Sequence, residues 1–253
     1  ATWSGNASTQ SITNDGNSDL KPDFTWTKPR GIGFGHKLMD STRGIGSSGK
    51  FLFSDATNAE DSINDYMMTF DTDGFSVGAG DAGFNASNDT YVTWQWKANG
   101  GTTSSNGDGS ITSTVQADTT AGFSIVTYTG NSNSPSSIGH GLGAVPKFYI
   151  IKQRNAVNAW KVWHSNLAAT DPEDYVIELN TTGARENNAI WNDTGPTSSV
   201  INFTDHGAVN QSGDTYVAYC FAEKQGYSKF GGYTGNGNVN GPFIYTGFKP
   251  AFV

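Results

Sequence analysis

Tryptophan side chains are the residues of this chain best suited to bind a ligand. Trp163 shares a predicted strand with Trp160, which falls on the opposite face, and Trp191 lies in a polar stretch at residues 186–199. A tryptophan ring exposed on a β-sandwich can stack on a sugar ring. The sequence therefore makes Trp163 and Trp191 candidate carbohydrate-binding residues, with packing beneath a loop as the alternative.

Two glycine-containing segments approach nucleotide and calcium loops without meeting the requirements of either. Residues 44–50 read Gly-Ile-Gly-Ser-Ser-Gly-Lys, but a phosphate loop needs Ser or Thr next, and the chain has Phe51. Residues 71–74 read Asp-Thr-Asp-Gly, but Gly80 stands where an EF-hand needs its closing Glu. We expect turns at both places and no cofactor, with a Ca²⁺ site assembled from other loops as an open alternative.

Histidines and carboxylates show none of the spacings that catalytic or metal sites use. The four histidines are scattered along the chain: His36, His140, His164 and His206. The adjacent carboxylates at residues 60–61 and 173–174 would point to opposite faces of a strand, so neither pair could flank a glycosidic bond. The sequence predicts no catalytic residue and no metal ligand, and hence not an enzyme.

The elements that must position all these residues are β-strands. Aromatic residues make up 13% of the 253 residues, charged residues only 15%, and there are 32 glycines. Such turn-rich, aromatic-rich composition is typical of all-β proteins and unlike that of disordered chains. The net charge of −8 argues against nucleic acid as a partner, and no apolar run approaches the roughly 20 residues of a membrane helix.

Three short motifs recur along the chain. The first, Trp/Tyr-Ser/Thr-Gly-Asn, occurs at residues 3–6, 128–131 and 233–236. The second centres on a proline followed closely by Phe, at Pro22, Pro146 and Pro250. The third, Asp-Thr-Tyr-Val, begins at Asp89 and Asp214. Recurrence in constant order predicts an internal duplication.

The repeats divide the chain into units of about 100 residues, the size of a β-sandwich. We expect tandem antiparallel β-sandwiches of jelly-roll or lectin-like type: a first repeat at 1–98 and a second at 126–224. Residues 99–125, rich in Gly, Ser and Thr, are predicted to be a linker or a loop with one short strand at 110–115. Residues 225–253 are predicted to start a third repeat or to form a C-terminal extension. We also expect the 253 residues to be a processed or partial segment of a longer chain.

Period-two alternation predicts the strands and their buried faces. Strands are expected at residues 24–27, 51–54, 66–70, 90–96, 123–129, 147–152, 160–164 and 175–179. In the strand at 90–96 the face with Val92, Trp94 and Trp96 is predicted to be the buried one. The single cysteine, Cys220, is expected to be partly buried and inert.

Residues 117–131, the loop Ile-Gly-His-Gly-Leu-Gly at 138–143 and Pro-Lys-Phe at 146–148 together resemble a repeat family of bacteriophage virion proteins. Such repeats are frequent in phages of marine bacteria, including cyanobacteria. Later markers of the repeat fall at residues 160–164, 196–200 and 213–219. The resemblance covers essentially the whole chain, although the first unit has Trp3-Ser4 for Tyr-Thr and lacks the Gly-His-Gly-Leu-Gly loop.

The resemblance implies a non-enzymatic structural protein of the virion surface. It would be a segment of a tail fibre or appendage, or a decoration of the capsid or tail. The implied partners are other virion proteins and further copies of the chain, with a trimer as one form. Host adhesion through a surface glycan is an additional implied role.

Two alternatives remain open at the level of the sequence. A carbohydrate-binding, lectin-like module outside a virion would use Trp163 and Trp191. A hydrolase of host glycans would need a site assembled from distant loops.

Overall fold

The structure of the protein, a computed structural model, describes residues 1–46, 49–62, 67–79 and 83–253. Ser47, Ser48, Tyr66 and Gly80, which entered the sequence predictions, lie outside the described residues. The described chain is built almost wholly from antiparallel strands, with short helical turns at η1 (Pro172–Asp174), η2 (Ala189–Trp191) and α1 (Gly207–Asn210). This confirms the all-β fold. None of these described helices is long and apolar enough to cross a membrane.

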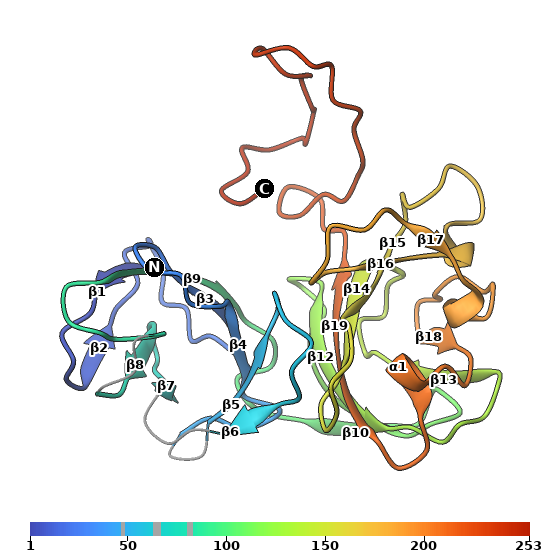
Figure 1. Ribbon diagram of the computed structural model, residues 1–253, viewed down its shortest axis with the longest axis horizontal. Helices are drawn as coiled ribbons and strands as arrows, with labels where there is room; N and C mark the ends of the chain where they lie inside the picture. Colours follow the sequence, from blue (N-terminus) through green and yellow to red (C-terminus); the bar gives the residue numbers. More distant parts are fainter. Residues whose placement is uncertain (47–48, 63–66, 80–82) are drawn as a thin grey trace.

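The first unit is a small sandwich of a six-stranded and a three-stranded sheet (Figure 1). The six-stranded sheet has the order β1 (Thr2–Ser4), β9 (Thr90–Trp96), β3 (Phe24–Pro29), β4 (Lys37–Asp40), β5 (Lys50–Phe53) and β6 (Asp61–Ser62). The three-stranded sheet has the order β2 (Gln10–Ile12), β8 (Phe75–Val77) and β7 (Met67–Phe70). Apolar side chains fill the space between the sheets, among them Ile12, Met39, Phe51, Phe75 and Phe84.

The second unit repeats this arrangement with a larger main sheet. Its eight strands have the order β10 (Ser104–Asn106), β11 (Ser113–Asp118), β12 (Phe123–Thr129), β19 (Thr215–Ala222), β14 (Pro146–Gln153), β15 (Lys161–His164), β16 (Tyr175–Glu178) and β17 (Glu186–Asn187). A two-stranded sheet, β13 (Ser136–Gly139) with β18 (Val200–Phe203), covers one face. The enclosed core includes Tyr128, Tyr149, Trp163, Trp191 and Phe203.

Corresponding strands of the two units pair in the same register. Trp3 lies opposite Tyr91 in the pair β1–β9, and Tyr128 lies opposite Tyr216 in the pair β12–β19. The correspondence extends outward from these central pairs. Trp26 pairs with Trp94 as Ile150 pairs with Tyr219, and Lys50 pairs with Ser62 as Tyr175 pairs with Asn187. Each recurrent motif of the sequence therefore occupies the same place in both units.

Residues 99–125 do not form a linker, which corrects that alternative of the sequence prediction, and they hold more than the one short strand expected at 110–115. They contain β10, β11 and the start of β12, and β11 pairs along its length with β12 of the second unit. Val115 and Ile111 point into the second core. The Gly/Ser/Thr-rich composition was misleading because Thr is common in loops and also favours strands.

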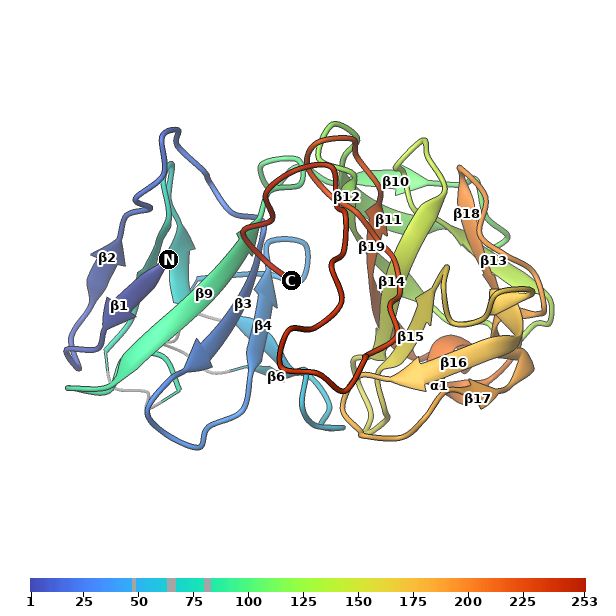
Figure 2. The same ribbon diagram turned by 90° about the horizontal axis from the view of Figure 1, so that it is seen from above.

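The main sheets of the two units lie side by side (Figure 2). A third, shared hydrophobic core joins them. The first unit contributes Phe24, Leu38 and Leu52, and the second contributes residues that include Ile125, Ile150, Trp160, Val217 and Tyr219. The rings of Phe24 and Tyr219 lie 4.5 Å apart, centroid to centroid. The core of the second unit covers one face of β19 and the shared core covers the other. Successive residues of this strand are therefore all buried, as in Tyr216, Val217, Ala218 and Cys220.

The predicted buried face of the strand at 90–96 is corrected by the structure. Tyr91 and Thr93 are fully buried, whereas Val92, Trp94 and Trp96 are only half-buried. Tyr91 faces the core of its own sandwich. The Trp94 face is turned toward the second unit, which covers it in part. Alternation identifies two faces of a strand but cannot say which one meets the denser layer.

Most predicted strands are present, with bounds that differ by a few residues. The expected strands at 24–27, 51–54, 90–96, 123–129, 147–152, 160–164 and 175–179 correspond to β3, β5, β9, β12, β14, β15 and β16, and the described part of 66–70 to β7. Short strands were missed, notably β4, because three or four residues give too little alternation to recognise.

Residues 225–253 follow the last strand as an extended tail without helix or strand. A bridge between Lys224 and Ser228 stands at its start. Both views place the tail above the junction of the two units (Figures 1 and 2). Its aromatic side chains are largely exposed, including Tyr233, Phe243 and Tyr245.

Candidate functional site

The two tryptophans predicted to bind sugar are buried, which corrects that prediction. Trp163 is 4% exposed and Trp191 is 0% exposed. The Trp163 ring stacks on Tyr149 at 5.2 Å, and Trp191 meets the same Tyr149 ring edge-on at 5.0 Å. The Trp191 indole N–H also donates to the carbonyl of Tyr175 at 3.0 Å. Neither ring presents a face on which a sugar could stack.

Trp160, on the opposite face of the same region, is also fully buried. Its indole Nε1 donates to the carbonyl of Phe53 at 2.7 Å and to that of Ala56 at 3.2 Å. Both carbonyls belong to the first unit. Trp160 and Trp163 lie on opposite faces and are both buried, because the sheet is covered on both faces.

The other candidates of the sequence analysis remain dispersed. Among the described residues, no group of three or more His, Cys, Asp or Glu side chains is placed to hold a metal ion. His140 is buried in its loop, where its Nδ1 accepts from the N–H of Leu142 at 3.2 Å and its Nε2 lies 3.2 Å from the carbonyl of Thr197. Burial lowers the pKa of His140, so its neutral form is favoured. Turn geometry accounts for this histidine.

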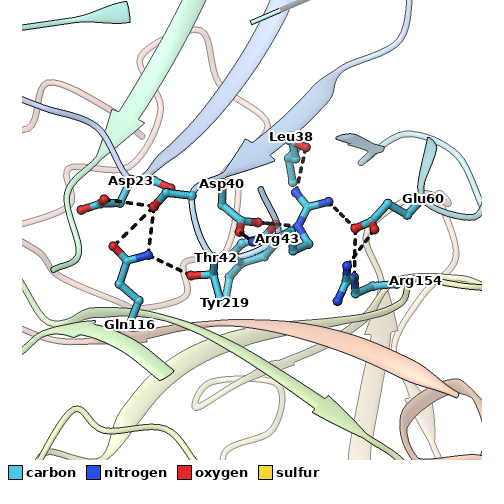
Figure 3. A network of polar contacts seen from close by, with 10 residues as sticks. Asp23, Leu38, Asp40, Thr42, Arg43, Glu60, Gln116, Arg154 and Tyr219 are labelled. Carbon is cyan, nitrogen blue, oxygen red and sulfur yellow. Dashed lines mark hydrogen bonds and ion pairs between the residues drawn. The ribbon is translucent and has the colours of Figure 1, made fainter. Parts of the chain in front are cut away.

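The polar side chains that do converge lie where the two units meet (Figure 3). Arg43 is at the centre. Its Nε contacts Asp40 Oδ2 at 2.5 Å, and its Nη1 donates to Glu60 Oε2 at 2.9 Å. Its Nη2 donates to the carbonyl of Leu38 at 3.0 Å. The guanidinium is fully enclosed by these partners.

The second unit supplies two partners to this group. Tyr219 donates its hydroxyl to Asp40 Oδ2 at 2.7 Å. Arg154 donates two hydrogen bonds to the Glu60 carboxylate, from Nε to Oε2 at 2.9 Å and from Nη2 to Oε1 at 2.8 Å. The backbone N–H of Glu60 also donates to the carbonyl of Arg154 at 2.6 Å. We call Asp40, Arg43, Glu60, Arg154 and Tyr219 the inter-unit polar cluster.

The environment fixes the charge state of the inter-unit polar cluster. Burial alone would raise the pKa of Glu60, but hydrogen bonds and charges from Arg154 and Arg43 outweigh it and lower that pKa. Burial raises the pKa of Tyr219 well above its ordinary value, with Asp40 adding to the effect and Arg43 opposing it. Glu60 is thus a carboxylate and Tyr219 a neutral donor at neutral pH.

A neighbouring group ties β11 to the first unit. Gln116 Nε2 donates to the hydroxyls of Ser41 at 2.9 Å and Thr42 at 2.8 Å. Asp23 is fully buried, and its Oδ2 accepts from the N–H groups of Ala98 at 2.8 Å and Gly100 at 2.9 Å. These bonds immobilise the start of the segment predicted to be a linker.

The geometry of the inter-unit polar cluster suits a structural lock. Each charged group is paired inside the interface, and none of the five residues except Arg154 borders a hollow described for the surface. The larger hollow, of about 500 Å³, is open and lined by residues 97–100 and 117–119. The smaller, of about 230 Å³, is lined chiefly by threonines beside Arg154. Asp40 is fully buried, and the side chain of Glu60 is 10% exposed and held by two arginines.

Sequence reasoning missed every member of the inter-unit polar cluster as a polar site. The pairing of Tyr219 with Asp40 spans 179 residues, and no motif links the two positions. The one usable signal is composition: in a chain with 15% charged residues, an arginine beside predicted core strands needs a partner.

Comparison with known proteins gives one match. A family model described as Domain of unknown function (DUF7483) matches residues 1–253. No curated protein matches the chain, and neither does any solved structure.

Proposed function

The chain belongs to the DUF7483 domain family, and we propose that it is a non-enzymatic structural protein of a bacteriophage virion surface. In this role it forms a segment of a tail fibre or appendage, or a decoration of the capsid or tail. Its partners are other virion proteins and further copies of the chain. Its two sandwiches are copies of one duplicated unit.

The observation that carries the proposal is the junction between the units. A shared hydrophobic core and the inter-unit polar cluster join two sandwiches into one body. Burying a charged group is costly unless every partner is in place, so such a cluster favours one relative placement of the units. The polar groups of the inter-unit polar cluster bind one another and hold the two units together. This arrangement supports a mechanical role rather than a chemical one.

The shared strand register supports the duplication. The six neighbouring strands of the first main sheet have the same order as six neighbouring strands of the second main sheet. The central pairs match residue for residue. The assignment to a virion rests on the resemblance of residues 117–131, 138–143 and 146–148 to phage virion repeats. The low charge and acidic balance of the chain are compatible with an extracellular particle surface.

The carbohydrate-binding alternative has lost the residues on which it depended, since Trp163 and Trp191 are buried. The hydrolase alternative gains no described pair of accessible carboxylates in a hollow. We therefore retain the structural role as the single proposal.

Immunogold electron microscopy tests this proposal. Antibodies raised against residues 1–253 are applied to purified particles of a phage whose genome encodes the chain. Label along thin projections would assign an appendage, and label spread over the shell would assign a decoration. Particles that carry no label, while the same antibodies detect the chain in the infected cells, would refute the virion role.

A further inference from the structure

The first recurrent motif has a defined docking partner in each unit. Trp3 stacks on Tyr91 at 5.1 Å and 17°, and Tyr128 stacks on Tyr216 at 5.0 Å and 16°. In both units the partner is the tyrosine of the Asp-Thr-Tyr-Val strand, directly opposite in the ladder. The aromatic residue of the motif is thus held by one kind of strand.

The same partner strand explains why the motif has a glycine. A Cβ added at Gly5 would lie 2.0 Å from the carbonyl oxygen of Ala86, and one at Gly130 would lie 2.3 Å from that of Gln211. Ala86 and Gln211 each lie five residues before the partner tyrosine. Only glycine admits so close a backbone approach.

The asparagine of the motif completes the contact. The backbone N–H of Asn6 donates to Asn85 Oδ1 at 3.0 Å, and that of Asn131 donates to Asn210 Oδ1 at 2.9 Å. Asn85 and Asn210 are both fully buried and precede the partner tyrosine by six residues. The docking partner therefore has the pattern Asn-x-Ser-x-Asp-Thr-Tyr-Val in both units, at residues 85–92 and 210–217.

The tail carries a third copy of the motif, already folded locally but without this partner. Asn236 Oδ1 accepts from the N–H of Asn238 at 3.0 Å, as Asn6 accepts from Ser8 and Asn131 from Asn133. Tyr233, however, is 69% exposed, and open space lies where a Cβ of Gly235 would be. The turn that presents the motif is formed, and its docking face is free.

We propose that residues 228–236 are the acceptor for an antiparallel β-strand of the pattern Asn-x-Ser-x-Asp-Thr-Tyr-Val, supplied by another polypeptide segment. The two strands of this pattern within the chain are already paired on both edges, β9 by β1 and β3, and β19 by β12 and β14. In the bound state the incoming tyrosine stacks on Tyr233. The incoming asparagine accepts from the N–H of Asn236. Such strand addition gains affinity from main-chain hydrogen bonds and specificity from alternate side chains.

The acceptor is continuous with the interface that joins the units. Phe230 stacks on Phe148 at 6.2 Å, and Phe252 lies edge-on to Trp94 at 5.7 Å and to Trp96 at 6.0 Å. Charge also favours the proposed occupant. Residues 224–253 contain three lysines and no acidic residue, whereas the incoming pattern carries an aspartate. The proposal does not depend on the virion role.

A synthetic peptide tests the acceptor directly. A fluorescently labelled peptide of residues 209–222, with Cys220→Gln as at Gln95 of the first unit, is titrated with the full chain and followed by anisotropy. We expect saturable one-to-one binding, and hydrogen exchange protection that appears at residues 228–236. An absence of binding, or protection located elsewhere, would overturn the proposal.

Matched variants distinguish specific binding at the acceptor from non-specific binding of the peptide. Gly235→Val should abolish binding because its side chain fills the space needed by the incoming backbone, while Gly241→Val should leave binding unchanged. Tyr233→Ser should weaken binding at least ~10-fold, and Tyr245→Ser, on another exposed tyrosine of the tail, should not. In the peptide, Asn210→Ala should weaken binding about 10-fold.

Two other results would count against the proposed occupant. Binding unaffected by Gly235→Val would show that the motif is not the acceptor. Self-association of the chain through the tail, without any affinity for the peptide, would instead assign the tail to a contact between copies.

Discussion

Glu60 neutralises two arginines of different units, Arg43 at 2.9 Å and Arg154 at 2.8 Å. Its side chain is 10% exposed, so solvent screens these pairs only weakly. Replacing the carboxylate leaves Arg154 without its counter-charge in the interface, and leaves Arg43 with Asp40 as its one remaining carboxylate in the cluster. Such a loss of counter-charge is destabilising even when the original pair contributed little net stability.

Glu60→Gln is therefore expected to lower the free energy of unfolding by about 3 kcal/mol. The measurement is equilibrium denaturation in urea at pH 7. Asp61→Asn is the matched control, because Asp61 is the exposed neighbour and should change stability by less than about 0.5 kcal/mol. Equal effects of the two variants would contradict a structural role for the cluster.

Cys220 predicts a specific loss of stability in alkali. Burial raises the pKa of its thiol to about 12 in the folded protein. The unfolded thiol has a pKa near 8.5. Because the folded pKa is the higher one, the stabilisation is complete below about pH 8.5 and is lost as the pH rises toward 12.

Between pH 7 and pH 10, the native protein should lose about 2 kcal/mol more stability than Cys220→Ala. Denaturation at both pH values under reducing conditions measures this difference. Burial lowers the pKa of Lys152 to about 8, which changes stability in the opposite direction, but equally in both proteins. Identical pH dependence of the two proteins would refute the burial of the thiol.

Within each sandwich, the first motif pairs with the Asp-Thr-Tyr-Val strand in the main sheet. The N–H of Gly5 donates to the carbonyl of Asp89 at 2.8 Å, and that of Gly130 to the carbonyl of Asp214 at 2.9 Å. These bonds join segments more than 80 residues apart. The glycines are required because the opposing backbone leaves no space for a side chain.

Gly5→Ala and Gly130→Ala are each expected to destabilise the protein by about 2 kcal/mol, the usual cost of overpacking. Thermal or urea denaturation measures the loss. Gly235→Ala is the internal control, because the same motif position in the tail faces open space and should cost less than about 0.5 kcal/mol. A similar loss at all three positions would show that the close approach is not the cause.

The two sandwiches should behave as one cooperative body, because the core between them belongs to both. Phe24 of the first unit is 2% exposed and packs on Phe123 and Tyr219 of the second. Separating the units would expose this core and uncover the charges of Glu60 and Arg43. Local opening of one unit alone is therefore disfavoured.

Phe24→Ala should cost about 3–5 kcal/mol and lower the stability of both units together. Hydrogen exchange at increasing urea concentrations, followed separately in β3 and β14, measures the two units in one experiment. Coincident midpoints that shift by the same amount are expected. A shift confined to β3 would mean that the two sandwiches unfold as independent domains.

Several features of the fold could be predicted from the sequence because they depend on local pattern. Alternation gave β9 at its observed bounds, residues 90–96. The motifs were recognisable because their glycine, asparagine and tyrosine each satisfy a fixed contact. The composition gave the all-β class for the same reason, since strand and turn preferences act over a few residues.

The tertiary structure alone decided which faces are buried and which polar groups meet. Alternation divides a strand into two faces, but whether one or both are covered depends on a second layer far away in the chain. For that reason the sequence left open whether Trp163 and Trp191 are exposed or packed, and whether residues 99–125 form a linker or a loop with one short strand. The contact of Tyr219 with Asp40 and the closure of Glu60 between two arginines exist only once the two sheets face each other. Long-range pairing of this kind leaves no periodic trace in the sequence, because each partner is chosen by the geometry of the assembled layers.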